Sequence, residues 1–181
     1  MARSDRTSRA LGVLLATLLA WHTLEKVQTG LLPEMFWACH LATAIAAVGC
    51  LVDRPALSTF GGLFHLVVGL PAWLLELAVH GTTPSSAALH LVTPAVGVWA
   101  ARREGVPSWI APAGAALWLG AQLVGRTLDP ALNVNLAWHP YDVLPAGFPA
   151  WGSHLVNLAL VTLALQALTL GAKKLGAAVV R

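Results

Sequence analysis

The residues of this chain that could do chemistry are a cysteine and several histidines, placed in or beside long apolar runs. Cys39 and His40 are neighbours in one run, and His90 lies inside another. An ionisable side chain within an apolar membrane helix is costly to bury and is therefore a candidate for function. Glu76 and His154 are weaker candidates, because they lie closer to the ends of their runs.

Most of the histidines are expected to gather near one face of the protein. Counting from the helix ends at about 1.5 Å per residue places six of the seven histidines in this outer layer: His22, His40, His80, His90, His139 and His154. His65 falls in the other half of its run, so we expect it to stand apart.

A cysteine nucleophile is the first chemistry that these residues could support. The Cys39 thiol would need a base to take its proton, and a histidine on a neighbouring helix such as His90 could supply one. His40 lies about 100° around the helix from Cys39, so it is poorly placed for that role. This interpretation requires no cofactor.

A bound metal ion or haem is the second chemistry. The number of potential ligands suffices for zinc, although the sequence has no HExxH or HxxxH spacing: His22, His40, His90, His139, His154, Glu76 and Asp142. Two facing histidines could hold a haem, and without a CxxCH motif it would be non-covalent. The preferred set for either group is His40, His90 and His154.

These residues must be positioned by membrane helices, because the composition is not that of a soluble globule. The 181 residues are 57% hydrophobic and 10% charged, where soluble proteins carry about 25% charged residues. Each apolar run approaches the roughly 17 to 25 residues that cross a hydrocarbon core. We predict an all-α, polytopic membrane protein with one domain of six transmembrane helices, at about 10–29, 34–52, 57–79, 85–102, 107–125 and 149–171.

The basic residues predict the orientation of these helices. Nine of the 11 Lys and Arg fall on the side that holds the terminal segments 1–9 and 172–181. The positive-inside rule therefore places both termini in the cytoplasm of a multi-pass cell-membrane protein, and the loop 126–148 outside. The basic residues are spread over separate segments without interleaved aromatics, which argues against a nucleic-acid partner.

Small residues and prolines predict how these helices pack. Gly61 and Gly62 should allow another helix to approach closely, and Pro71 and Pro94 should kink their helices. Cys39 and Cys50 lie 11 residues apart on one helix, a separation of about 16 Å that excludes a disulfide between them.

Three segments together resemble a known family. Residues 36–43 (FWACHLAT), 87–94 (AALHLVTP) and 133–136 (NVNL), the last followed by the stretch 140–149, resemble the family of polytopic proteins that includes transmembrane protein 164 and bacterial YwaF-like proteins. The resemblance covers roughly residues 30–160.

The resemblance implies acyl chemistry on membrane lipids, with Cys39 as the nucleophile and His90 as the base. It also implies that His40, Asn133 and Asn135 support the reaction by orienting the base or donating to an oxyanion. We expect the outer loop, with Asn133, Asn135, His139, Tyr141 and Asp142, to cap the site, with His154, Asp142 and Glu76 as further supporting residues.

The remaining alternatives concern partners. The acyl interpretation implies a membrane lipid as substrate, which would reach the site laterally from the bilayer. A structural subunit of a larger membrane complex, or a homo-oligomer, is the third interpretation. Kinship alone would not fix the reaction, because function depends on the site rather than on the fold.

Overall fold

The computed structural model shows an α-helical protein and describes residues 2–138, 149–174 and 179–180. Its α-helices are α1 Ala2–Gln28, α2 Ala38–Leu51, α3 Pro55–Phe64, α4 Leu70–His80, α5 Pro84–Glu104, α6 Ile110–Gly125 and α7 Ala150–Lys174. The short helical segments are η1 Leu32–Phe36, η2 His65–Gly69, η3 Pro130–Leu132 and η4 Val134–Leu136. Strand β1 Val106–Pro107 pairs in parallel with β2 Val179–Val180.

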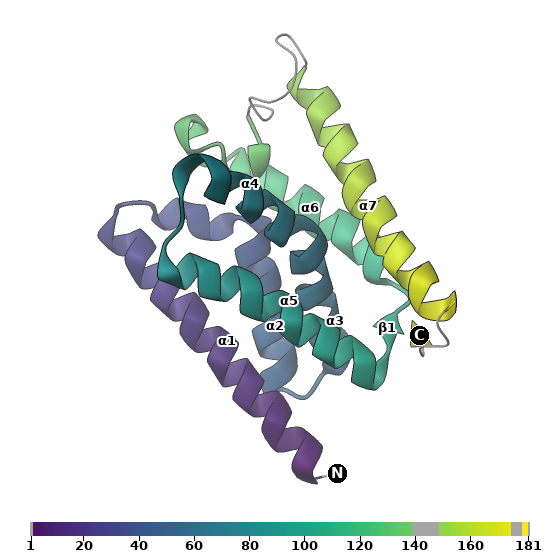
Figure 1. Cartoon of the computed structure of the whole chain (residues 1–181). Helices are drawn as coiled ribbons and strands as arrows, with labels where there is room; N and C mark the ends of the chain where they lie inside the picture. Colours follow the sequence, from purple (N-terminus) through teal and green to yellow (C-terminus); the bar gives the residue numbers. More distant parts are fainter. Residues whose placement is uncertain (1, 139–148, 175–178, 181) are drawn as a thin grey trace.

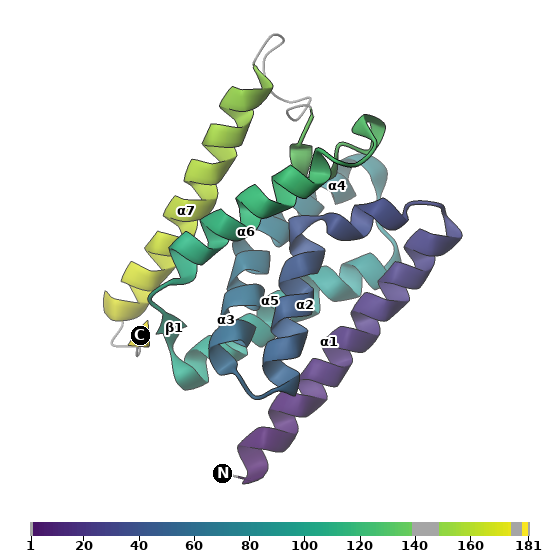
Figure 2. The ribbon, with the colours of Figure 1, turned by 180° about the vertical axis from the view of Figure 1, so that it is seen from behind.

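The helices form a bundle with α2, α3 and α5 in contact at its centre. Helix α1 packs on α2 and α5, whereas α7 packs mainly on α6 (Figure 1). In both views α1 and α7 lie at opposite edges of the bundle (Figure 2). The main apolar core joins α2, α3, α6 and α7 around Phe64, Ile110 and Leu165, which are fully buried.

Three helical stretches are long and apolar enough to cross a membrane, which indicates a membrane protein. They are Arg6–Gln28, Pro55–Ala78 and Trp151–Ala172. Helix α2 has 14 residues, so it is about 21 Å long, which is shorter than a hydrocarbon core of about 30 Å. The structure confirms an α-helical protein, but it does not confirm that six helices cross the membrane.

The predicted helix 57–79 contains a change of helical type. Helix α3 continues through the π-helical segment η2 into α4, and the Leu70 N–H donates to the His65 carbonyl. Pro71 has no N–H to donate to the preceding turn, and a wider π turn is one way in which a helix accommodates such a break. We predicted a kink at Pro71, and the structure has this π segment directly before Leu70 and Pro71.

Glycines bring α3 into close contact with its neighbours, as predicted for Gly61 and Gly62. A Cβ on Gly62 would lie 2.2 Å from Gly97 Cα on α5, and a Cβ on Gly61 would lie 2.4 Å from the Ala42 carbonyl on α2. No side chain fits at either position, so these contacts fix how closely the elements that carry the histidines can approach.

Candidate functional site

Four histidines from four different elements meet inside the bundle, and we call them the histidine cluster: His22 of α1, His40 of α2, His65 of η2 and His90 of α5. Their ring centres are 4.9 Å apart for His22 and His40, 6.2 Å for His40 and His90, and 4.7 Å for His65 and His90. Each residue is at most 5% exposed.

Two rings of the cluster are held by backbone carbonyls. His40 Nδ1 lies 3.1 Å from the Glu34 carbonyl, and His90 Nδ1 lies 2.9 Å from the Ser86 carbonyl. A carbonyl oxygen can only accept a hydrogen bond, so Nδ1 carries the proton in both rings. With one ring proton each, His40 and His90 therefore keep an unprotonated Nε2.

The other two rings are held by hydroxyl groups and reach the same state. Ser85 donates its proton to the Glu25 carboxylate, so its oxygen accepts from His22 Nδ1 at 2.8 Å. Thr43 donates to the Cys39 carbonyl at 3.0 Å, so its oxygen accepts from His65 Nδ1 at 3.1 Å. The Nε2 atoms of both rings are then acceptors as well.

The Nε2 atom of His65 is the least satisfied of these acceptors. It is fully buried and has no hydrogen-bond partner. A buried polar atom without a partner costs about 1 to 3 kcal/mol, and such an atom calls for an explanation in a native structure. Because Thr43 binds Nδ1 of the same ring, the direction in which Nε2 points is fixed.

Cys39 lies beside this nitrogen. A Cβ on Gly69 would lie 2.7 Å from Cys39 Cβ and 2.8 Å from His65 Nε2, so both side chains pack closely against Gly69. Cys39 is a free, half-buried thiol in the first turn of α2.

This arrangement changes the predicted role of His65. The expectation that His65 stands apart is wrong. His65 begins η2, which continues α3, and the His65 ring packs against the His90 ring. The structure also places His65, rather than His90, next to the side chain of Cys39. The His90 ring contacts the His65 ring edge to face, and Trp73 of α4 is stacked on it with the ring centres 5.6 Å apart.

His154 is not part of the cluster. It lies on α7, 3.0 Å from Gln122 Nε2 and 3.2 Å from an Arg126 guanidinium nitrogen. The preferred metal or haem set of His40, His90 and His154 is therefore not brought together. Glu76 is exposed on α4. Among the other predicted residues, His139, Tyr141, Asp142 and the side chain of His80 lie outside the described part of the chain.

Asn135 supports the site by bonds that leave its amide no free donor. Its Oδ1 accepts from the Ala38 N–H at 2.7 Å, and its Nδ2 donates to the carbonyls of Phe36 at 2.9 Å and Ala121 at 2.8 Å. It therefore anchors the start of α2, directly before Cys39, and has no N–H left for an oxyanion. Asn133 Oδ1 accepts from the Trp138 N–H at 3.0 Å.

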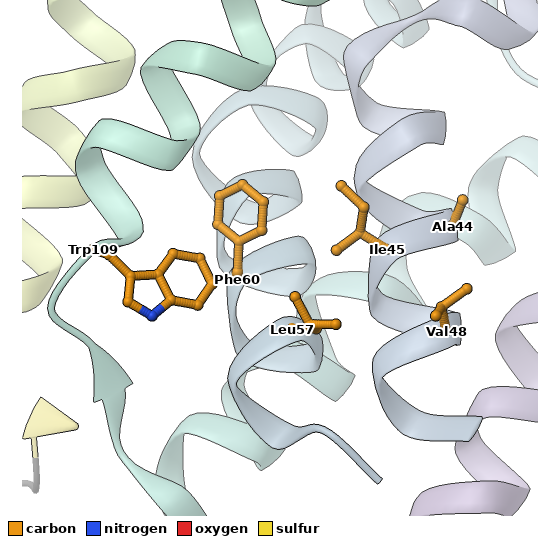
Figure 3. Close-up of a pocket in the computed structure, with 6 residues that line it drawn as sticks. All are labelled: Ala44, Ile45, Val48, Leu57, Phe60 and Trp109. Carbon is orange, nitrogen blue, oxygen red and sulfur yellow. The ribbon is translucent and has the colours of Figure 1, made fainter. Parts of the chain in front are cut away.

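An apolar groove lies away from the histidine cluster. Ala44, Ile45, Val48, Leu57, Phe60 and Trp109 line a groove between α2, α3 and the start of α6 (Figure 3). None of its lining residues belongs to the histidine cluster. The groove therefore does not help to assign the chemistry.

Sequence reasoning did not identify the hydroxyl groups that hold the rings, or His65 itself. Thr43 and Ser85 are ordinary helix residues in a sequence, and their role appears once α2, α5 and η2 are packed together. The useful signal for His65 was the spacing His65-x3-Gly69-x-Pro71, because a small residue before a proline favours an irregular turn.

Comparisons with known proteins leave the family open. No family model matches the chain, and no match is found among curated proteins or solved structures. The resemblance to the transmembrane protein 164 and YwaF-like family therefore stays a prediction, and the geometry of the site must carry the functional argument.

Proposed function

We propose that this protein is a membrane-embedded enzyme that transfers or hydrolyses the acyl groups of membrane lipids, with Cys39 as the nucleophile and His65 as the base. One observation carries the proposal: the buried Nε2 of His65 has no hydrogen-bond partner and lies beside the Cys39 side chain. Thr43 acts as the orienting group, because it accepts from His65 Nδ1. A nucleophile, a base and an orienting group are the parts that acyl transfer requires.

The reaction would proceed through a thioester. The Cys39 sulfur attacks the carbonyl carbon of a lipid ester while His65 Nε2 takes the thiol proton. The carbon–oxygen bond to the lipid alcohol then breaks, and His65 returns the proton to the leaving oxygen. An acceptor hydroxyl or water next attacks the thioester, and its proton passes through His65 to the Cys39 sulfur.

The apolar surroundings of Cys39 make a base necessary. A buried thiolate is costly to form, so the thiol proton should leave only as the sulfur attacks. We assign this proton transfer to His65, whose ring packs against Gly69 together with the Cys39 side chain. A bundle with six spans, cytoplasmic termini and the cluster near the outer face completes the proposal, since a lipid would then enter sideways from the bilayer.

An acyl-transfer probe tests the proposal directly. Purified protein in detergent would be treated with a lipid-like activated ester and the labelled cysteine identified by mass spectrometry. We expect Cys39→Ala to abolish labelling and Cys50→Ala, which removes the other free cysteine, to retain it. The change His65→Asn is the sharpest variant, because its amide can still donate to Thr43 but has no group at the Nε2 position.

The expected effect of His65→Asn is a decrease in labelling rate of about 100-fold or more, as for the loss of a general base. His90→Ala should have a smaller effect, because that ring does not adjoin the thiol. Equal labelling of wild type and His65→Asn would contradict the assignment of the base. Labelling that is indifferent to Cys39→Ala would contradict the proposed function.

A further inference from the structure

We propose that His22, His40 and His90 bind a divalent transition-metal ion of the zinc class through their Nε2 atoms. This site would be separate from the Cys39–His65 pair and does not rest on the proposed acyl chemistry.

The anchoring of the rings is that of metal ligands. Histidines that bind a metal nearly always donate their other ring N–H to a carbonyl, a carboxylate or a water, which fixes the ring and leaves one nitrogen for the ion. His40 and His90 donate Nδ1–H to carbonyls. His22 donates to Ser85, which in turn donates to the Glu25 carboxylate.

The three rings come from three elements that pack side by side. Helix α1 contacts both α2 and α5 (Figure 1). By their residue numbers, the three histidines lie near the end of α1 and near the starts of α2 and α5. Structural and catalytic zinc sites are built in this manner, from ligands on different segments. Three histidine ligands leave one coordination position for water or a substrate.

The spacing of the His22 and His40 rings is what a shared ion requires. With a metal–nitrogen distance of about 2.0 Å, two imidazoles at a tetrahedral angle have ring centres about 5 Å apart. The separation of His22 and His40 is 4.9 Å, whereas that of His40 and His90 is 6.2 Å. Within the described residues no three His, Cys, Asp or Glu side chains already converge on one point, so the His90 ring must approach as the ion binds.

The neighbours of the three rings include an aromatic ring and a carboxylate. Trp73 is stacked on the His90 ring with the ring centres 5.6 Å apart, so the two rings would shift together as His90 approaches the ion. Glu25 is partly exposed, its carboxylate lies 4.0 Å from His22 Nδ1, and it accepts from Ser85. A carboxylate at this position attracts a cation to the entrance of the site.

Metal titration tests the proposal without any assay of activity. The full-length protein in detergent would be stripped with a chelator, incubated with Zn²⁺, desalted and analysed for bound metal, and Co²⁺ would report the ligands by its visible spectrum. We expect about one ion per chain and a spectrum of tetrahedral Co²⁺ with nitrogen ligands. Bound Zn²⁺ should also raise the melting temperature.

Variants assign the ligands. Replacement of His22, His40 or His90 by Ala removes a ligand and should weaken Zn²⁺ binding by more than about 100-fold. Ser85→Ala removes only the group that holds the His22 ring and should weaken binding by about 10-fold. His154→Ala is the matched control and should bind as wild type. Cys39→Ala should also bind as wild type, so failure of the acyl proposal would leave this result unchanged.

The outcomes decide the proposal even if a variant folds poorly. The melting temperature of each metal-free variant shows whether it is folded, and Ser85→Ala keeps all three ligands. Absence of stoichiometric Zn²⁺ in the wild type would overturn the proposal. Binding that survives each of the three histidine changes would overturn it as well.

Discussion

The histidine cluster and His154 are two regions in which the same residue type has different surroundings. In the cluster each ring uses Nδ1 for a bond to a carbonyl or a hydroxyl, and the structure leaves Nε2 to other partners. In His154 both nitrogens already face polar side chains, Gln122 and Arg126. A histidine with one fixed and one available nitrogen is prepared to bind or to react, whereas His154 joins α6 to α7.

The two regions also differ in what their helix glycines contact. Around the cluster, a Cβ on Gly62 would meet the backbone of Gly97, so the backbones of α3 and α5 are in direct contact. On α6, a Cβ on Gly114 would lie 2.1 Å from the end of the Leu165 side chain of α7, and a Cβ on Gly120 would meet no atom within 4 Å. A side chain can move away from an added methyl group, whereas two backbones in contact can do so only if their helices separate.

The largest effect should come from a methyl group added between α3 and α5. Gly62→Ala places a Cβ 2.2 Å from Gly97 Cα, so α3 and α5 must separate, at an expected cost of about 3 kcal/mol in the free energy of unfolding. The matched control is Gly120→Ala, whose Cβ meets open space and should change stability by less than about 1 kcal/mol. Thermal denaturation in detergent measures both; equal melting temperatures would remove the distinction between the regions.

Asn135 gives the next effect, because it connects the two regions. Asn135→Ala leaves the Ala38 N–H and the Phe36 and Ala121 carbonyls without their partner, and we expect a loss of about 2 kcal/mol in the free energy of unfolding. Labelling of Cys39 per folded molecule should stay within about threefold of wild type, since Asn135 has no donor left for the reaction. A loss of labelling in fully folded protein would restore the oxyanion role that the resemblance implies.

The smallest effect should come from His154→Ala. The change removes the contacts with Gln122 and Arg126 at a partly exposed site, so stability should fall by about 1 kcal/mol or less. Acyl labelling and Zn²⁺ binding should both match wild type. If either fell by about 10-fold or more, His154 would belong to the functional group and the comparison of the two regions would fail.

Much of the helical organisation could be predicted from the apolar runs and their breaks. The predicted span 85–102 is close to α5 Pro84–Glu104, and 107–125 is close to α6 Ile110–Gly125. Two starts differ from the prediction: α1 begins at Ala2 rather than near residue 10, and α2 begins at Ala38 rather than near residue 34. Hydropathy continues through η1, but Pro33 and the bond from Asn135 to Ala38 set the start of the regular helix.

The candidate site could be predicted only in part. Cys39, His40 and His90 were identified because they are ionisable residues inside apolar runs, and the structure places them in or beside the cluster. The neighbour of Cys39 was not predicted, because a count of residues from a helix end gives depth but not the direction in which a side chain points. That direction for His65 depends on the π turns and on Thr43.

The π segment η2 has a consequence for how one long helix serves two sets of contacts. A regular helix turns by about 100° per residue, so an extra residue in a turn rotates everything after it by about that angle. Gly61 and Gly62 before η2 face α2 and α5, while Trp73 after it stacks on His90. Because η2 rotates the second half of the helix relative to the first, each half can direct a different face towards its own partners.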